Sequence, residues 1–246
     1  MSYFKYILSV ISALCICSCA MDKTLQYNNV TMGNFVDGKF ISDQGLTFNI
    51  VDRTCSESID TLKRAMISCD ILSRAGNEGY DVRLTGVDAI FTKNPVDSTS
   101  VVNDTDIMAE NPLNIGEMWY SAGYLNLLIY IPIKENSSTP HLINLVRNDK
   151  KAGAAVYQFT LKHNAYGEVP GEENPTMILA GAYVSFPLSE IVKEDTAEIR
   201  LQWKWYAPEN TDGEELQNYK GVVDWKKSLF EHTPSKTAKL SIASIN

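Results

Sequence analysis

Hydrophobic and polar residues alternate along much of the chain, and this is the periodicity of β-strands that bury one face. In the first half the alternation predicts several short strands with apolar inner faces, and no long helical pattern separates them. The predicted inner positions are Leu46, Phe48 and Ile50, then Ile67, Cys69 and Ile71, then Tyr80, Val82 and Leu84, with a last strand from Val87 to Phe91. Such closely spaced strands predict a small antiparallel barrel over residues 34–94.

Turn signals in the same region fix where the first strands end. Asp37-Gly38 stands between apolar flanks and predicts a two-residue hairpin turn, in which both positions need a positive φ. A second turn signal starts at Asp43. Between Ser56 and Met66 the apolar residues have helical spacing, so a short helix or a single helical turn is expected there.

The second half predicts a two-sheet sandwich over residues 112–246. From Ala197 to Trp205 every second residue is apolar and the residues between are polar, which is typical of a sandwich strand with one wet face. Leu125, Leu127, Ile129 and Ile131 form another inner face, but the intervening Leu128 is also apolar. That strand is therefore expected to be covered on both sides. Polar turns without crossover helices favour an immunoglobulin-like β-sandwich, and the polar, turn-rich stretch at residues 95–111 predicts a linker.

The N-terminal region has the order of a secretory signal: Lys5 precedes a largely apolar run from Ile7 to Ile16. The run is too short to span a bilayer as a helix. It ends in Ile16-Cys17-Ser18-Cys19, which resembles a bacterial lipobox, with an aliphatic residue three positions before a cysteine and a small residue one before it. Residues 1–18 are thus predicted to be a lipoprotein signal peptide, Cys19 the lipid-attached residue, and the unpatterned residues 19–33 a tether. The alternative is a plain secretory signal with incidental cysteines.

The charge and cysteine content of the chain limit the classes of partner that it is expected to bind. The chain has 22 basic and 30 acidic residues and a formal net charge of −8, and removal of residues 1–18 would take away only one charge, that of Lys5. Binding to nucleic acid requires a basic surface, so no nucleic acid is expected. Contact with a membrane is expected only through the lipid anchor. An oxidising envelope permits a disulfide between Cys55 and Cys69; the alternative is that Cys69 is a small core residue, in phase with its strand.

Candidate catalytic residues give weak signals. His141, His163 and His232 have no partner at metal-ligand spacing, and Ser121 lacks the first glycine of a nucleophile elbow. Four tryptophans offer a sugar-stacking surface, but two of them share the inward phase of one strand, so core packing is favoured. Those tryptophans are Trp119, Trp203, Trp205 and Trp225. No catalytic residue, metal site or cofactor is predicted.

Several strings, in their order along the mature chain, resemble the NigD-like lipoprotein family of Bacteroidota. They are Arg83-Leu84 with Ile90-Phe91-Thr92-Lys93; Pro112-Leu113-Asn114-Ile115 with Trp119 and Gly123-Tyr124-Leu125-Asn126; His141-Leu142-Ile143-Asn144-Leu145; Leu161-Lys162-His163-Asn164-Ala165; and Val184-Ser185-Phe186-Pro187-Leu188. Glu168 departs from the pattern, because the family usually has Asp there. The resemblance implies an N-terminal OB-type domain and a C-terminal immunoglobulin-like domain in a lipoprotein of the cell envelope, and it implies no catalytic residues.

Together these features predict a non-enzymatic, lipid-anchored module of the cell envelope that binds an envelope protein, a glycan or a peptide, on a face of the outer membrane that the sequence does not specify. One alternative is a fimbrilin-like structural subunit, which would polymerise by strand addition after cleavage at Arg53 or Arg64. Another is a hydrolase whose site is assembled from distant loops.

Overall fold

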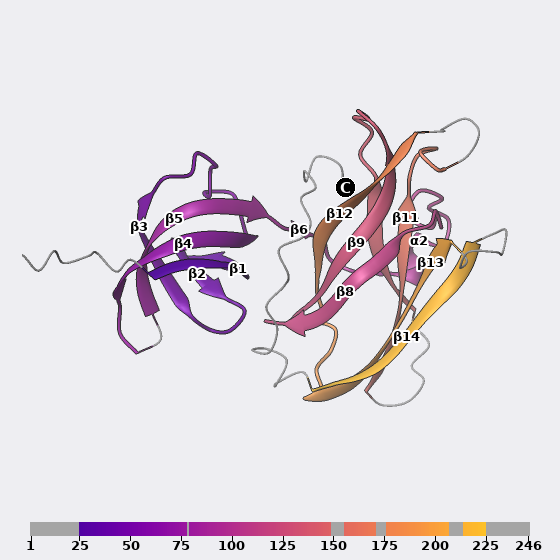
Figure 1. The fold of residues 1–246 in the computed structure, drawn as a ribbon. Helices are drawn as coiled ribbons and strands as arrows, with labels where there is room; N and C mark the ends of the chain where they lie inside the picture. Colours follow the sequence, from indigo (N-terminus) through magenta and orange to yellow (C-terminus); the bar gives the residue numbers. More distant parts are fainter. Residues whose placement is uncertain (1–24, 78, 149–154, 171–175, 207–213, 225–246) are drawn as a thin grey trace, which may run out of the picture.

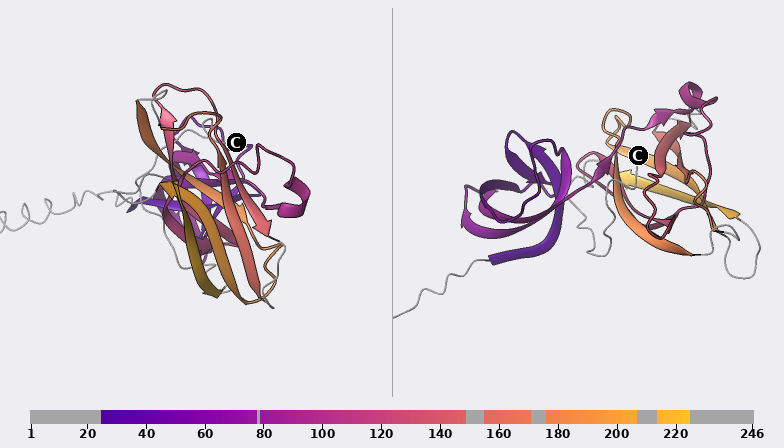
Figure 2. Two further views of the ribbon diagram at one scale, coloured as in Figure 1. Left: turned by 90° about the vertical axis from the view of Figure 1, so that its right-hand side faces the viewer. Right: turned by 90° about the horizontal axis from the view of Figure 1, so that it is seen from above.

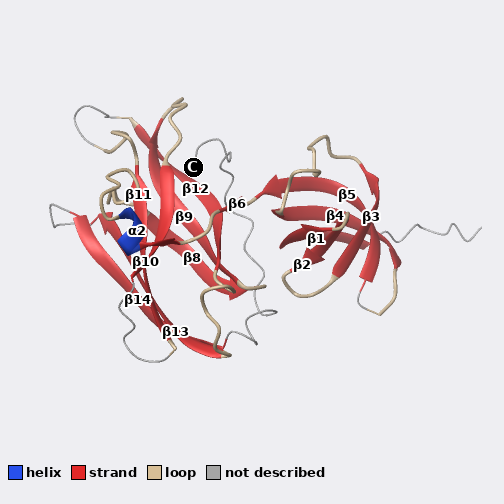
Figure 3. Cartoon of the chain, turned by 180° about the vertical axis from the view of Figure 1, so that it is seen from behind, coloured by secondary structure: helices blue, strands red, loops and turns tan. Residues whose placement is uncertain are grey.

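The computed structural model describes residues 25–77, 79–148, 155–170, 176–206 and 214–224, and nearly all of its regular structure is β-strand (Figure 3). The first five strands form a closed barrel in the order β1-β2-β3-β5-β4. Their bounds are β1 (Leu25–Val36), β2 (Lys39–Ser42), β3 (Thr47–Arg53), β4 (Arg64–Arg74) and β5 (Gly79–Ala89). The predicted barrel is confirmed, with one correction: β3 and β5 pair in parallel, because β5 rather than β4 lies beside β3.

The predicted inner faces of the barrel strands pack together as expected. Phe48, Ile67, Val82 and Leu84 are buried in one cluster. Asp37 and Gly38 form the two-residue turn between β1 and β2 with φ values of 49° and 76°, so the hairpin prediction is confirmed. The stretch expected to be a short helix contains one hydrogen-bonded turn, in which the Leu62 N–H donates to the Ile59 carbonyl over 3.1 Å.

The tether expected at residues 19–33 is too long. β1 begins at Leu25 and pairs with β4, so residues 25–33 belong to the barrel, and Met32 is buried. The sequence does not show this strand by alternation because its register shifts between Tyr27 and Thr31, which breaks the two-residue period. Residues 1–24, with the predicted signal peptide and Cys19, lie outside the described residues.

The second unit is a sandwich of two sheets (Figure 1), ordered β14-β13-β11-β10-β7 and β6-β12-β9-β8. The predicted sandwich is thus confirmed. The strands are β6 (Phe91–Thr92), β7 (Val96–Asp97), β8 (Asn114–Ser121), β9 (Tyr124–Lys134), β10 (Leu142–Asn148), β11 (Val156–Asn164), β12 (Met177–Pro187), β13 (Thr196–Tyr206) and β14 (Glu214–Asp224). The inner faces of both sheets form one core, which includes Leu127, Ile129, Phe159, Val184 and Leu201.

The segment expected to link the domains is part of the sandwich edge. β7 pairs in parallel with β10, and the short helix α2 (Ser98–Val101) follows it with Val101 buried. A strand of two residues is too short to produce a periodic signal in the sequence, which explains the error. No helix in the described part of the chain is long and apolar enough to cross a membrane.

The barrel lies beside the sandwich (Figures 1 and 2) and packs against the outer face of the β8-β9-β12 sheet. Leu128, Trp119 and Tyr183 on that face form a buried cluster with Met32 and Met66 of the barrel. The barrel is therefore the layer that covers the second side of β9, as the apolar Leu128 predicted.

Candidate functional site

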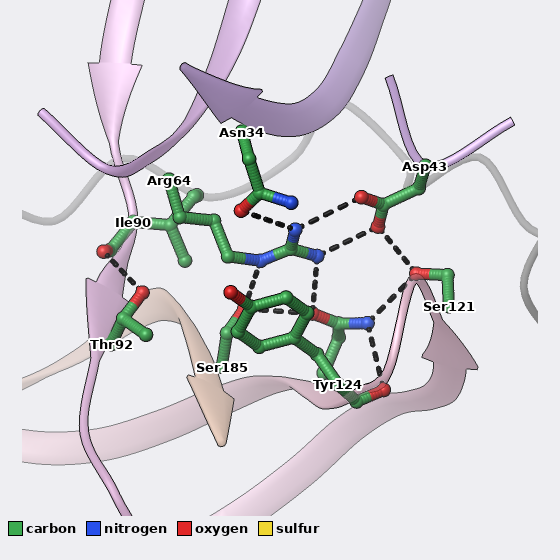
Figure 4. A network of polar contacts seen from close by, with 9 residues as sticks. Asn34, Asp43, Arg64, Ile90, Thr92, Ser121, Tyr124 and Ser185 are labelled. Atoms are coloured by element: carbon green, nitrogen blue, oxygen red, sulfur yellow. Dashed lines mark hydrogen bonds and ion pairs between the residues drawn. The ribbon is translucent and has the colours of Figure 1, made fainter. Parts of the chain in front are cut away.

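The most extensive buried polar network in the described residues lies where the barrel meets the sandwich, and its centre is Arg64. Arg64 is the first residue of β4 and pairs with Asn34 of β1. Asp43 follows β2 in a turn where the Gly45 N–H donates to the Ser42 carbonyl, and its own N–H donates to the Met32 carbonyl of β1 over 2.9 Å. These backbone positions direct both side chains toward the sandwich (Figure 4).

Every N–H of the Arg64 guanidinium has an acceptor. Nη1 and Nη2 donate to the two carboxylate oxygens of Asp43 over 2.9 and 2.7 Å. Nη1 also donates to Asn34 Oδ1 over 3.4 Å, Nη2 to Asn126 Oδ1 over 2.8 Å, and Nε to Ser185 Oγ over 2.9 Å. The side chains of Arg64 and Asp43 are 0% and 1% exposed. They form a buried ion pair in which every donor of the guanidinium is hydrogen-bonded.

The sandwich supplies acceptors and donors that complete the network. Ser121 donates to Asp43 Oδ2, and its own oxygen accepts from Asn126 Nδ2 over 2.9 Å. Ser185 Oγ donates to Asn126 Oδ1 over 2.7 Å. Asn126, Ser121 and Ser185 come from β9, β8 and β12, so all three long strands of this sheet reach the ion pair. We call the group formed by Asn34, Asp43, Arg64, Ser121, Asn126 and Ser185 the interdomain clamp.

A strained turn and an aromatic ring position the sandwich half of the clamp. Ala122 and Gly123 join β8 to β9 with φ values of 47° and 83°, and this two-residue turn places Ser121 opposite Tyr124. The Arg64 guanidinium lies over the Tyr124 ring, 4.1 Å from its centroid, within the range of a cation–π interaction. Trp119 and Tyr183 of the same sheet pack edge to face, with centroids 6.0 Å apart.

The hydrogen bonds of the clamp hold the barrel and the sandwich in a fixed relative orientation. Burying a charged pair costs several kcal/mol of desolvation, and only a fully hydrogen-bonded arrangement compensates that cost. If the domains moved apart, the guanidinium would lose Asn126 and Ser185 at once, so partial opening leaves unpaired buried groups. The arrangement therefore favours one relative orientation of barrel and sandwich.

The burial of Arg64 also corrects a sequence-based alternative. Cleavage at Arg64 was one route to a fimbrilin-like subunit, but its side chain is sealed and its carbonyl accepts from the Ile90 N–H over 3.0 Å. Arg53 is exposed and donates to the Glu57 carbonyl over 2.8 Å. Of the two proposed sites, only Arg53 is therefore accessible in the folded chain.

The structure brings two of the three histidines together at one end of the sandwich. His141 Nδ1 lies 2.9 Å from His163 Nε2, and His163 Nδ1 lies 3.1 Å from the Pro112 carbonyl oxygen. His141 Nε2 faces Glu168 at 3.4 Å. Both rings are buried, and each of their four nitrogens lies against another protein group of the cluster. His232 lies outside the described residues.

The remaining predicted residues that the structure describes have structural positions, and Trp225 lies outside the described residues. Cys55 and Cys69 are free thiols, and Cys69 is buried in the barrel core, which favours the core alternative over the disulfide. Burial raises the pKa of the Cys69 thiol to about 11. Ser121 belongs to the clamp, Trp119 to the interface cluster, and Trp203 packs against the sandwich core. Among the described residues, no three His, Cys, Asp or Glu side chains are placed to hold a metal ion.

Sequence reasoning did not find the clamp. Its six members lie at separations of up to 121 residues between hydrogen-bonded partners, and each is an ordinary residue for a strand end or a turn. The one available signal was the apolar Leu128 on the second face of β9, which predicted a cover but not its polar contacts.

Comparison with known proteins agrees with the architecture. The family model of the NigD-like C-terminal beta sandwich domain matches residues 94–217. No curated protein matches the chain.

Solved structures share the two-domain fold. A NigD-like immunity protein from Bacteroides caccae superposes with a TM-score of 0.58 at 16% identity, covering 80% of this chain and 97% of its own. A Bacteroides vulgatus protein of unknown function gives 0.58 at 17% identity, covering 80% and 89%. A candidate lipoprotein from Bacteroides fragilis gives 0.56 at 14% identity, covering 79% and 96%. At these identities the likeness shows the fold alone.

Proposed function

The chain belongs to the NigD-like family, and from this premise we propose that it is a lipid-anchored, non-enzymatic module of the outer membrane that binds another protein. Family membership, the lipobox-like sequence ending at Cys19 and the fold shared with a candidate lipoprotein support the anchor. The Bacteroides caccae relative is described as an immunity protein, and we extend that description to this chain as the expectation of a protein partner.

The observation that carries the proposal is the interdomain clamp. A binding protein loses affinity when its parts must be ordered on association, and a rigid scaffold reduces that cost. The sealed Arg64–Asp43 pair with its sandwich partners holds two domains in one orientation, which suits a partner that contacts both. The histidine cluster, whose ring nitrogens all face protein groups, gives no support to the hydrolase alternative.

The anchor is tested by metabolic labelling with an alkyne fatty acid in a bacterial host that processes lipoproteins. Cys19→Ser is expected to lose the label and to leave the membrane fraction. Cys17→Ser is the matched control, because it alters a thiol two residues away and is expected to keep the label. A Cys19→Ser protein that stays membrane-bound and labelled would contradict the anchor.

Partner binding is tested by chemical crosslinking and affinity capture from envelope extract, with the lipidated protein and a clamp variant, Asn126→Ala with Ser185→Ala. We expect a protein to be crosslinked to the wild type at defined sites on both domains, and at least tenfold less of it to the variant. Capture that recovers no protein above background, or equal capture by both forms, counts against a rigid binding scaffold. Protease shaving of whole cells then decides which face of the membrane presents the module.

A further inference from the structure

A chain of proton donors and acceptors runs through the end of the sandwich that carries the β9-β10 and β11-β12 connections. It starts at the Pro112 carbonyl, passes through His163 and His141, and ends at the Glu168 carboxylate, with contacts of 3.1, 2.9 and 3.4 Å. The function proposed above does not use these groups, and the bond pattern determines where their protons must lie.

The Pro112 carbonyl oxygen can only accept, so His163 Nδ1 carries a proton and donates to it. A neutral imidazole has one proton, which leaves His163 Nε2 as an acceptor. His141 Nδ1 must then donate to His163 Nε2. With its single proton on Nδ1, neutral His141 presents a bare Nε2 to Oε2 of Glu168.

Glu168 is held as an anion. Its carboxylate accepts from the Lys134 N–H over 3.2 Å and from the Ser137 hydroxyl. Burial raises the pKa of Glu168, but hydrogen bonds, first from Ser137 and the Lys134 backbone and then from Thr139 and His141, lower it by more. While His141 is neutral, the lone pair on its Nε2 faces a lone pair on Oε2 of Glu168, so no hydrogen bond forms between these two atoms.

We propose that uptake of one proton from solvent at Nε2 of His141 creates a hydrogen bond that joins the loop before β10 to the loop after β11. We call this bond the latch. The protonated ring donates a charge-assisted hydrogen bond to the ionised Glu168, whereas with a neutral ring Glu168 is held only by its hydrogen bonds from Lys134, Ser137 and Thr139. The turn from Ala165 to Glu168 is the part that the latch fixes, and it presents Tyr166, which is 47% exposed and has a φ of 47°.

The titratable groups near His141 and His163 indicate that only one proton, the one on His141, is gained. His163 of β11 and Glu168 of the following loop face the ring directly. From the segment before β8, Glu110 pairs with Lys162 and Asp106 accepts from Asn164. Burial lowers the pKa of His141 and Glu168 opposes that effect, while burial and His141 lower the pKa of His163 to about 4. Because His163 Nδ1 is hydrogen-bonded to Pro112 and His163 Nε2 accepts from His141, the position left for an added proton is Nε2 of His141, beside the Glu168 carboxylate.

The test follows imidazole nitrogen signals by long-range ¹H–¹⁵N NMR on the full chain in detergent between pH 8 and pH 4.5. We expect His163 to remain neutral with its proton on Nδ1 over most of this range. We expect His141 to carry its proton on Nδ1 at pH 8 and to gain the second on Nε2 on acidification. In Glu168→Gln the His141 midpoint should fall by about one pH unit, a tenfold loss of proton affinity. Glu135→Gln, which alters an exposed residue of the connection between β9 and β10, is the control and should leave the His141 midpoint unchanged.

Two results would overturn the latch: a proton on Nε2 of His141 at pH 8 with Nδ1 bare, or an unchanged midpoint in Glu168→Gln. Thermal melting gives a second readout, because the wild type should gain stability over Glu168→Gln as the pH falls from 8 to 5. A difference that is constant with pH would show a merely structural role. If Glu168→Gln does not fold, Ser137→Ala should raise the His141 midpoint by removing a donor from the carboxylate, and an unchanged or lowered midpoint would reject the proposal.

Discussion

Arg64 and Asp43 form a bidentate ion pair with bonds of 2.9 and 2.7 Å, and both side chains are sealed at the boundary between barrel and sandwich. Both residues belong to the barrel, but three of the remaining four members of the clamp come from the sandwich. Because removal of one member of a buried pair leaves an uncompensated charge, this relationship gives sharp mutational expectations.

Arg64→Met is expected to lower the free energy of unfolding by about 3–5 kcal/mol, since the Asp43 carboxylate stays buried without its partner. The double variant Arg64→Met with Asp43→Asn should lose less free energy of unfolding than the sum of the losses in the two single variants. Denaturant unfolding measures both. Arg83→Met is the control, because Arg83 and Asp52 are 38% and 51% exposed and such a pair contributes about 1 kcal/mol or less. Equal losses at Arg64 and Arg83 would show that the clamp does not stabilise the fold.

Asn126→Ala is expected to uncouple the two domains. The amide of Asn126 joins Arg64, Ser121 and Ser185, and its loss leaves buried groups unpaired at about 1–3 kcal/mol. Calorimetry should show one unfolding transition for the wild type and two for this variant. Asn148→Ala is the control, since Asn148 donates to Thr160 Oγ1 within one sheet. Two transitions already present in the wild type would contradict the coupling.

The free energy of unfolding is expected to decrease as the pH is lowered, because of His163. Burial lowers the pKa of its imidazole to about 4 in the folded chain, whereas an unfolded histidine titrates near 6.5. Above pH 6.5 both states are neutral and nothing is lost; between pH 6.5 and 4 only the unfolded state binds the proton. The loss reaches about 3 kcal/mol at the acid end of that window. Urea unfolding from pH 7.5 to 4.5 should show this slope, reduced in His163→Gln; identical slopes would refute it.

The two barrel cysteines should differ in reactivity. Burial raises the pKa of the Cys69 thiol to about 11 and removes it from solvent, so Cys69 should resist alkylation at pH 8 until the chain unfolds. Cys55 is partly exposed and should react first. Peptide mapping by mass spectrometry after alkylation distinguishes them. If neither thiol reacts in denaturant without reductant, the two are bridged.

Gly33 should tolerate no side chain. A Cβ there would overlap the Ile41 carbonyl oxygen and lie 2.7 Å from the Ser42 Cα, both backbone atoms that cannot move aside cheaply. Gly33→Ala is expected to cost about 1–3 kcal/mol in unfolding free energy. Gly86→Ala is the matched control in another barrel strand, because its Cβ would meet Ser68 Cβ at an ordinary 3.7 Å. A smaller loss at Gly33 than at Gly86 would contradict this packing.

Hydrophobic periodicity and turn residues were sufficient to predict the class of structure and much of its local detail. Alternation assigned Phe48 and Leu84 to the barrel core and Leu127 and Leu201 to the sandwich core, because a period of two records which face a strand buries. Asp37-Gly38 determined its own turn, since few other residues adopt two successive positive φ values.

The way the two domains meet, and the polar residues that share a site, could be seen only in the folded chain. β1 escaped detection because a register shift breaks its period, and β7 because two residues carry no period at all. Arg64 meets Asn126 and Ser185, and His141 meets Glu168, through contacts that depend on the packing of whole sheets. Hydrophobic periodicity reports on a residue's own strand, whereas a hydrogen bond between distant strands leaves no mark on the local pattern.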